Sequence, residues 1–292
     1  EQMRSRTRVE KDGVRPLEYG LMPRGMGDCG LKDGDDLYGV FVPHNIWSVY
    51  ADNLTLEAAR ILGRTDDIET FQIIYDTASR DLIDAMRRGA IAETEYRWIP
   101  GVLGKTSGSR WGALNALFPC GLLAPDDELV TGTIRHLRAA MSPGGLPMNT
   151  GWLVNGMWVA IALDNLAEAH LVRNEGDEAA ALLYATLNHA TPLITWCEER
   201  GPEPGATEVT GDRQHLWTPV AVVREVRDSL VMEVGDTLCL ARGINRDWLG
   251  SGLPRLGRSA QRFRLAAPES RRCCRGRCHR LHKPWAATSA PR

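Results

Sequence analysis

Apolar residues recur at helical spacing in two consecutive stretches of the chain. Between Pro43 and Ile61 an apolar side chain returns every three or four residues, and Gly63 follows as a stop signal. From Thr65 to Gly89 the same period continues, behind a Thr-Asp-Asp start that is typical of a helix N-terminus. The short Gly-Arg-Thr connection predicts that the two helices form an antiparallel hairpin.

The alternation of helix and loop continues further along. The pattern predicts a short helix over 109–118 and longer helices over 125–141, 158–172, 177–190 and 216–231. The connecting loops are rich in Gly, Trp and acidic residues, and no region before residue 250 has a convincing strand pattern. The sequence therefore predicts an all-α body built from helical hairpins.

A glycine-rich acidic stretch precedes the first hairpin. Residues 24–39 contain five glycines and four aspartates, among them Asp28 and Asp33. Glycine allows the backbone to approach a ligand closely, so the stretch is typical of an active-site loop on a rigid scaffold. A solvated surface turn is the alternative, since Asp and Gly are ordinary turn formers. A calcium-binding loop is not expected, because the aspartate spacing does not match the helix-loop-helix calcium motif.

Tryptophans recur in the loops between the predicted helices. A ring of helical hairpins would bring these loops to one end, where indole faces beside carboxylates and amides suit a sugar. Core anchors between helices are the alternative for each single tryptophan. The candidates for such a sugar-binding pocket are Trp98, Trp111, Trp152, Trp196 and Trp217.

Charge divides the chain into two parts. The 292 residues are 43% hydrophobic and 25% charged, with a net charge of −2. Residues 255–292 hold eleven Lys/Arg and one acidic residue, which leaves 24 basic and 36 acidic residues, a net charge of −12, for residues 1–254. An acidic body argues against nucleic acid or an anionic membrane surface as its partner.

Neither a membrane segment nor an export signal is visible in the sequence. No run of 18 apolar residues exists, and the N-terminus lacks an apolar signal-peptide core. We therefore expect a cytoplasmic location, with export of a longer parent chain left open. Four scattered cysteines (29, 120, 197 and 239) are expected as reduced thiols, and the cluster of three at 273–278 lacks the second Cys-x-x-Cys pair of a zinc site.

Several stretches, in order, resemble the six-hairpin or (α/α)6-barrel glycosidases, in particular the glucoamylase-like branch. Residues 28–52 resemble the segment that holds the general acid of that family, and Trp196-Cys-Glu-Glu199 followed by Leu216-Trp-Thr218 resembles the segment that holds its general base. Residues 113–127 with the Gly-Gly-Leu turn at 144–146 are similar to a helix, loop and turn of the same family. The resemblance covers roughly residues 20–232.

The resemblance implies an (α/α)6-type toroid and a glycoside hydrolase with two catalytic carboxylates, of the inverting kind. The general acid falls near Lys32 or Asp33; we take Asp33, a departure from the glutamate of glucoamylases, with Asp28 second. Glu199 is ranked first as the general base, then Glu198, with Glu208 a fallback.

Further polar residues precede the last predicted helix. Arg213 and His215 are candidates for hydrogen bonds to sugar hydroxyls, unless Asp212 simply caps the helix and pairs with Arg213. A carbohydrate is the expected partner; no cofactor, metal, nucleic acid or membrane is expected, and the oligomeric state is left open.

Three expectations concern alternatives and completeness. Another carbohydrate-active enzyme on the same scaffold (a phosphorylase, epimerase or lyase) and an inactive fragment remain alternatives. The helices predicted are fewer than a ring of six hairpins needs, so residues 1–252 are expected to be a partial catalytic domain. Residues 253–292 are expected to be a basic, irregular tail produced by a reading-frame slip, or else a real tail that binds an acidic partner.

Overall fold

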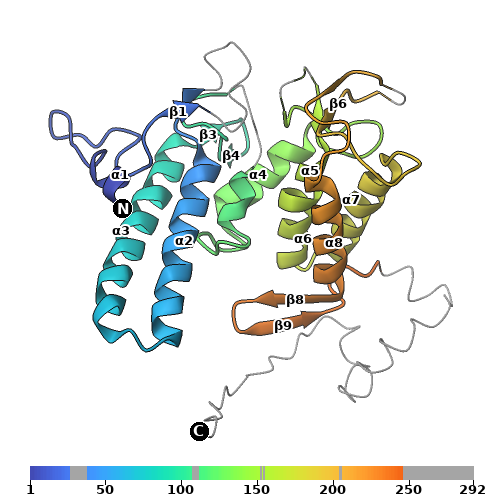
Figure 1. The fold of residues 1–292 in the computed structure, drawn as a ribbon. Coiled ribbons are helices and arrows are strands. Elements are labelled where there is room, and N and C mark those ends of the chain that lie inside the picture. The colour runs from blue at the N-terminus through green and yellow to red at the C-terminus, as the bar shows by residue number, and fades with distance from the viewer. Residues whose placement is uncertain (27–37, 107–111, 152, 154, 204–205, 246–292) are drawn as a thin grey trace, which may run out of the picture.

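The computed structural model describes residues 1–26, 38–106, 112–151, 153, 155–203 and 206–245 (Figure 1). Its helices dominate, and four small antiparallel sheets accompany them. The expectation of an all-α body is therefore too simple, whereas the expectation of a mostly helical chain is confirmed. The predicted tail over 253–292 lies outside the described residues.

The predicted hairpin near the N-terminus is confirmed. Helix α2 (Val42–Ile61) and helix α3 (Thr65–Gly89) are joined by a turn in which Gly63 takes a φ of +66°, a value that favours glycine. Figure 1 shows the two helices side by side. The short helix α1 (Gln2–Ser5) lies against α2, because the buried Arg4 guanidinium donates a 2.6 Å hydrogen bond to Ser48 and pairs with Asp52.

Two small hairpins and a shorter helix follow. Strand β1 (Gly25–Met26) pairs with β2 (Tyr38–Gly39), and β3 (Ile91–Ala92) pairs with β4 (Arg97–Trp98). Of the helix expected over 109–118, residues 109–111 lie outside the described part of the chain, and Ala113–Ala116 form a 3₁₀ turn, η2.

Helix α4 is shorter than its pattern predicts. It covers Glu128–Arg138 instead of 125–141, because the Asp127 side chain caps it by accepting a 2.9 Å hydrogen bond from the Leu129 N–H. It packs on strand β4, and Gly132 makes this possible: a Cβ there would lie 1.8 Å from the Arg97 carbonyl oxygen.

The long apolar helix expected over 158–172 is present, with an irregularity inside it. Helix α5 (Val159–Ile161) continues into a π-helical segment η3 (Ala162–Ala167) and then into α6 (Glu168–Val172). Its partner α7 (Gly176–Asn188) returns beside it, close to the predicted bounds. π-helical segments are rare and are frequent at functional sites.

The last part of the described chain contains a feature that the pattern analysis missed. Helix α8 (Trp217–Leu230) is confirmed, but it leads directly into strand β8 (Val231–Val234), which pairs with β9 (Thr237–Leu240). The prediction that no strand precedes residue 250 is therefore wrong. Met232 and Cys239 face each other across this hairpin and are both buried.

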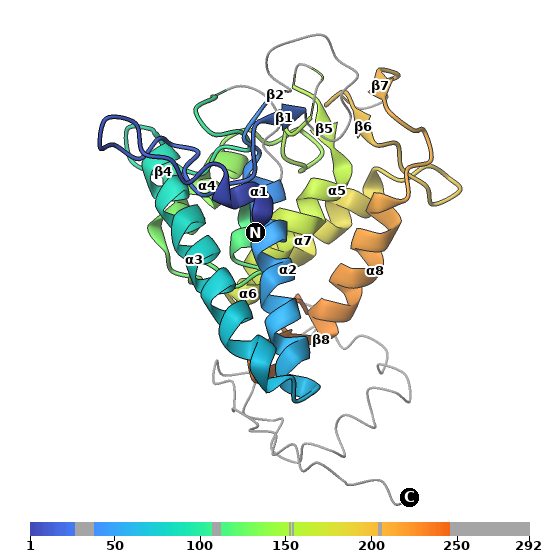
Figure 2. The same ribbon diagram turned by 60° about the vertical axis from the view of Figure 1, so that its left-hand side comes forward.

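The helices enclose one hydrophobic core that extends from α2 to β9. Figures 1 and 2 both show β1 and β6 at one end of the helices and β8 at the other, and Figure 2 shows β2 and β5 at the same end as β1 and β6. The prediction that the long loops gather at one end fits this arrangement. Of the helices that the structure describes, none combines the length and apolar character that crossing a lipid bilayer requires.

Candidate carboxylate site at the loop end

A three-stranded antiparallel sheet at the loop end carries the predicted general-base segment. Strand β6 (Glu199–Arg200) lies between β5 (Met157–Trp158) and β7 (Val209–Thr210). Glu199 is the direct partner of Trp158 on one side and of Thr210 on the other. Because directly opposed residues share a face of a sheet, Glu199 and Trp158 lie on the same face.

The Glu199 carboxylate is buried and held by the backbone. The residue has 0% of its surface exposed, and its Oε1 accepts a 2.8 Å hydrogen bond from the Leu153 N–H. Gly151 and Gly156 lie against the same oxygen: a Cβ on either would come within 2.4 Å and 2.3 Å of it, respectively. The two glycines therefore form a close backbone cradle that fixes where this carboxylate can be.

Glu198 lies on the opposite side, since neighbouring residues of a strand point to opposite faces. Its backbone N–H donates a 2.9 Å hydrogen bond to the Asp212 carbonyl, and its side chain lies over Gly211, whose φ is +69°. The Glu198 Oε1 atom is 4.0 Å from Nε2 of His215. The two candidate bases thus belong to different surroundings, while Glu208 has an exposed side chain further along the loop.

Aromatic rings connect this sheet to the start of helix α8. Trp217 is half-buried and meets Trp158 edge to face, with ring centroids 5.5 Å apart. The centroid of the His215 ring lies 6.3 Å from the centroid of the Trp217 ring. The Trp217 side chain hydrogen-bonds to Asp164 of the π-helical segment. Of the predicted sugar-binding residues, Trp217 and His215 are therefore brought together beside the carboxylates, and Arg213 is exposed close to them in sequence.

Two of the predicted tryptophans have the contacts of core anchors. Trp98 is 3% exposed and stacks on His136 with ring centroids 3.7 Å apart. Trp196 is 2% exposed, and its indole N–H donates a 2.8 Å hydrogen bond to the Thr186 carbonyl. The remaining candidates lie outside the described residues: Asp28, Asp33, Trp111 and Trp152.

A cluster of buried acids below Trp217 was not found from the sequence. Arg224 pairs with Asp164, and its Nε donates a 2.8 Å hydrogen bond to Oε1 of Glu168. Glu168, Glu225 and Asp228 are 1%, 0% and 2% exposed, so at least three carboxyl groups share this part of the core.

Burial dominates the acid strengths in this cluster. It raises the pKa of Glu168 to about 7, although Arg224 opposes this, and it raises the pKa of Glu225 to about 9 with help from the charges of Glu168 and Asp228. Burial also raises the pKa of Asp164, against the attraction of Arg224 and the Trp217 hydrogen bond. Protons are therefore retained in this cluster at neutral pH.

A signal for the cluster was present in helix α8. Ala221, Glu225 and Asp228 are spaced as one helical face and are all buried. The opposite face carries exposed apolar residues instead, at 43–77% exposure: Leu216, Val220, Val223, Val226 and Leu230. The sequence shows both faces, but its apolar stripe predicts the opposite burial, so the structure was needed to find the cluster.

Comparisons with known proteins add no assignment. No protein-family model matches the chain, and no curated protein matches it significantly. Within the described residues, no group of three or more His, Cys, Asp or Glu side chains is arranged to hold a metal ion.

Proposed function

We propose that the protein is a glycoside hydrolase that cleaves a glycoside or oligosaccharide with a pair of carboxyl groups. The observation that carries the proposal is Glu199: a buried glutamate, fixed by a backbone N–H and two glycines, on a sheet beside an edge-to-face tryptophan pair. Such preorganisation is costly to build and is typical of a catalytic carboxylate.

Glu199 takes the role of general base. Its Oε1 accepts a hydrogen bond from the Leu153 N–H, which holds the carboxyl group in one position, as a base that takes a proton from water must be held. The activated water would attack the anomeric carbon on the face opposite to the leaving group, which gives inversion.

Asp33 takes the role of general acid, with Asp28 second. Both belong to the acidic loop, whose two ends are held together by β1 and β2 through the pairs Gly25–Gly39 and Met26–Tyr38. In Figures 1 and 2 these strands lie at the same end as β5 and β6. The acidic loop is thus rooted at the end where Glu199 lies, which supports a catalytic pair drawn from the two segments.

Trp217 and His215 are proposed to bind the sugar. The indole offers an apolar face for the C–H groups of a pyranose, and the imidazole offers hydrogen bonds to hydroxyls. Asp164 holds the Trp217 indole through a hydrogen bond and thereby orients it.

We also propose that the helical hairpins belong to an (α/α)6 ring. The hairpins α2–α3 and α6–α7 are antiparallel neighbours of the expected kind. Helix α2 exposes Trp47, Leu54 and Ile61 at a spacing of seven, and α8 exposes the apolar stripe described above. Both stripes are surfaces on which further helices of a ring would pack.

The test is hydrolysis of a panel of 4-nitrophenyl glycosides and oligosaccharides. Glu199→Gln should lower kcat by about 10²–10⁴-fold without loss of folding, because the amide cannot accept the proton of water. Asp33→Asn should lower kcat to a similar extent, because the amide cannot protonate the leaving group. The matched control is Glu203→Gln, which changes an exposed glutamate on the following loop.

Three outcomes would contradict parts of the proposal. Full activity of Glu199→Gln with loss in Glu198→Gln would move the base to Glu198, and full activity of both would remove the base from this segment. Turnover that requires inorganic phosphate and survives Glu199→Gln would identify a phosphorylase. The anomer released first, observed by NMR, tests inversion.

A further inference from the structure

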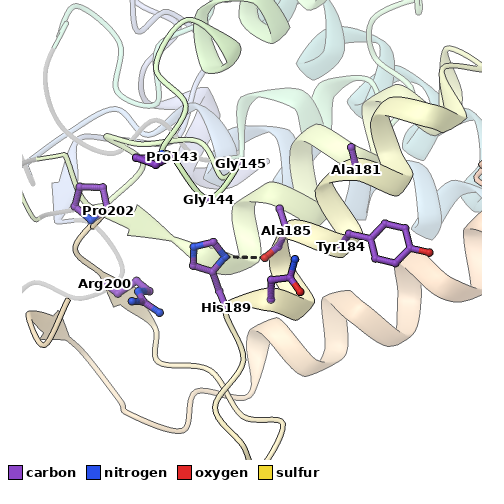
Figure 3. A pocket seen from close by; sticks show the side chains of 10 residues that line it. Pro143, Gly144, Gly145, Ala181, Tyr184, Ala185, His189, Arg200 and Pro202 are labelled. Carbon is purple, nitrogen blue, oxygen red and sulfur yellow. Dashed lines mark hydrogen bonds between the residues drawn. The ribbon is translucent and has the colours of Figure 1, made fainter. Parts of the chain in front are cut away.

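A wide hollow lies between the end of helix α7 and the segment that follows Glu199. Its volume is about 770 Å³, within the range of pockets that hold small organic ligands. The turn after Met141, the end of α7 and the residues that follow Glu199 form its walls, as Figure 3 shows. Its lining includes Pro143, Gly144, Tyr184, His189, Arg200 and Pro202.

Arg200 supplies a cation to this hollow. It follows Glu199 on β6, so strand alternation places its side chain on the opposite face of the sheet. Its Nε is withdrawn from solvent and has no hydrogen-bond acceptor, and no carboxylate of the described residues pairs with its guanidinium. The Nη groups at the end of a guanidinium that pairs with no carboxylate are the donors through which it can bind an anionic ligand.

His189 forms a neighbouring wall in a fixed orientation. Its Nδ1 lies 2.7 Å from the Ala185 carbonyl oxygen, which can only accept, so Nδ1 carries the proton and donates. Gly144 packs against the ring: a Cβ there would lie 2.5 Å from Cε1 of the imidazole. The ring therefore cannot turn freely and forms a fixed wall of the hollow, while Arg200 supplies the donors for an anion.

Two features oppose an anion here. Helix α7 ends at Asn188, and the carbonyl end of a helix disfavours negative charge. The Glu198 carboxylate, on the same face of the sheet as Arg200, disfavours it as well. The His189 N–H already satisfies the Ala185 carbonyl near that end, and a charge-assisted hydrogen bond to Arg200 outweighs the weak field of a helix end. The balance favours binding of an anion.

We propose that this hollow binds a small organic anion, with a carboxylate or phosphate group on Arg200 and an apolar body against Pro143, Pro202 and Tyr184. Arginine binds both groups through two parallel N–H donors, so the shared chemistry is a planar or tetrahedral oxyanion. The site is separate from the Glu199 face, and the proposal does not depend on the proposed hydrolase activity.

Calorimetry and ligand-observed NMR on the full 292-residue chain test this inference. The probes are glucose 6-phosphate, glucuronic acid and inorganic phosphate, with glucose as the neutral comparison. At least one anionic probe should bind at least tenfold more tightly than glucose, and its affinity should fall with added salt. The phosphate and carboxylate probes separate the two possible sources of the oxyanion.

Variants assign the binding to Arg200. Arg200→Gln should weaken the anionic probe at least tenfold, and Arg200→Lys, which keeps the charge but loses the fork, should weaken it less. Arg64→Gln removes the same charge from an arginine that is 67% exposed at the distant α2–α3 turn, and it should bind as the wild type does. Thermal unfolding of each variant shows that it is folded; if Arg200→Gln is not, Arg200→Lys decides alone.

The inference is overturned if no anionic probe is preferred over glucose, or if the Arg64 and Arg200 variants lose equal affinity. Because Glu199→Gln should keep the anion affinity, failure of this site and failure of the proposed hydrolase are distinguishable. Unchanged probe affinity in a folded Arg200→Lys variant would also show that the guanidinium does not hold the anion.

Discussion

The Glu225→Gln substitution should stabilise the protein at neutral pH. Glu225 is fully buried, and its surroundings raise its pKa from 4.5 to about 9. At pH 7 the folded chain therefore holds a proton on this carboxyl group that the unfolded chain has released. Glutamine is neutral in both states, so the substitution removes the cost of taking up that proton.

The magnitude follows from the linkage between folding and proton binding. A carboxyl group whose pKa rises on folding costs nothing below pH 4.5, and its cost grows with pH until about pH 9. From 4.5 to 7 the cost reaches about 3 kcal/mol, at 1.36 kcal/mol for each pH unit. We therefore expect up to about 3 kcal/mol of added stability at pH 7 and almost none at pH 4.5.

Urea unfolding followed by circular dichroism between pH 4.5 and 8.5 measures this difference. The wild type should lose stability as the pH rises through this range, and Glu225→Gln should lose clearly less. The control is Glu203→Gln: Glu203 is exposed, so replacing its carboxyl group by an amide should change the stability little at any pH. A variant that is less stable than the wild type at every pH, with an unchanged pH slope, would show that Glu225 is ionised and well paired in the fold.

Two further predictions concern packing and thiol reactivity. Gly132→Ala should destabilise the fold by about 1–3 kcal/mol, because the new Cβ would clash with the Arg97 carbonyl oxygen. The higher helix propensity of alanine would by itself have the opposite effect. Urea unfolding measures the change, and a stabilised variant would contradict the close contact. Cys120 should resist maleimide at pH 8 until the chain unfolds, because burial raises the pKa of its thiol to about 12. The half-buried Cys197 should react earlier. Peptide mapping by mass spectrometry distinguishes the two cysteines, and equal reaction rates would contradict the burial argument.

The helical hairpin α2–α3 could be predicted almost to the residue because local signals agree there. Helical periodicity, the Gly63 stop and the acidic start after Arg64 all indicate the same bounds. The hairpin β8–β9 was missed although Gly235 and Asp236 form a two-residue turn of the kind that joins strands. The strands follow helix α8 without a break, so the change of period was hidden in one apolar run.

The candidate site was predictable only in part. The sequence indicated Glu198 and Glu199, yet their opposite orientations depend on β6 being a strand, and that segment had been expected to be a loop. The π-helical segment was not predicted, because the spacing of its residues gives no sign of a changed hydrogen-bond register. Trp98 and Trp196 show the limit of composition: a tryptophan in a loop can still turn into the core.

The buried acids link the stability of helix α8 to the proposed site. Replacing them with apolar residues would remove a desolvation cost, so their presence needs a reason other than stability. The contacts of these acids suggest a reason. Arg224 joins Asp164 and Glu168, and Asp164 holds the indole of Trp217, the first residue of α8. Directional hydrogen bonds fix the rotation of a helix in a way that apolar contacts do not. We infer that the cluster trades stability for the orientation of Trp217 beside Trp158, the strand partner of Glu199.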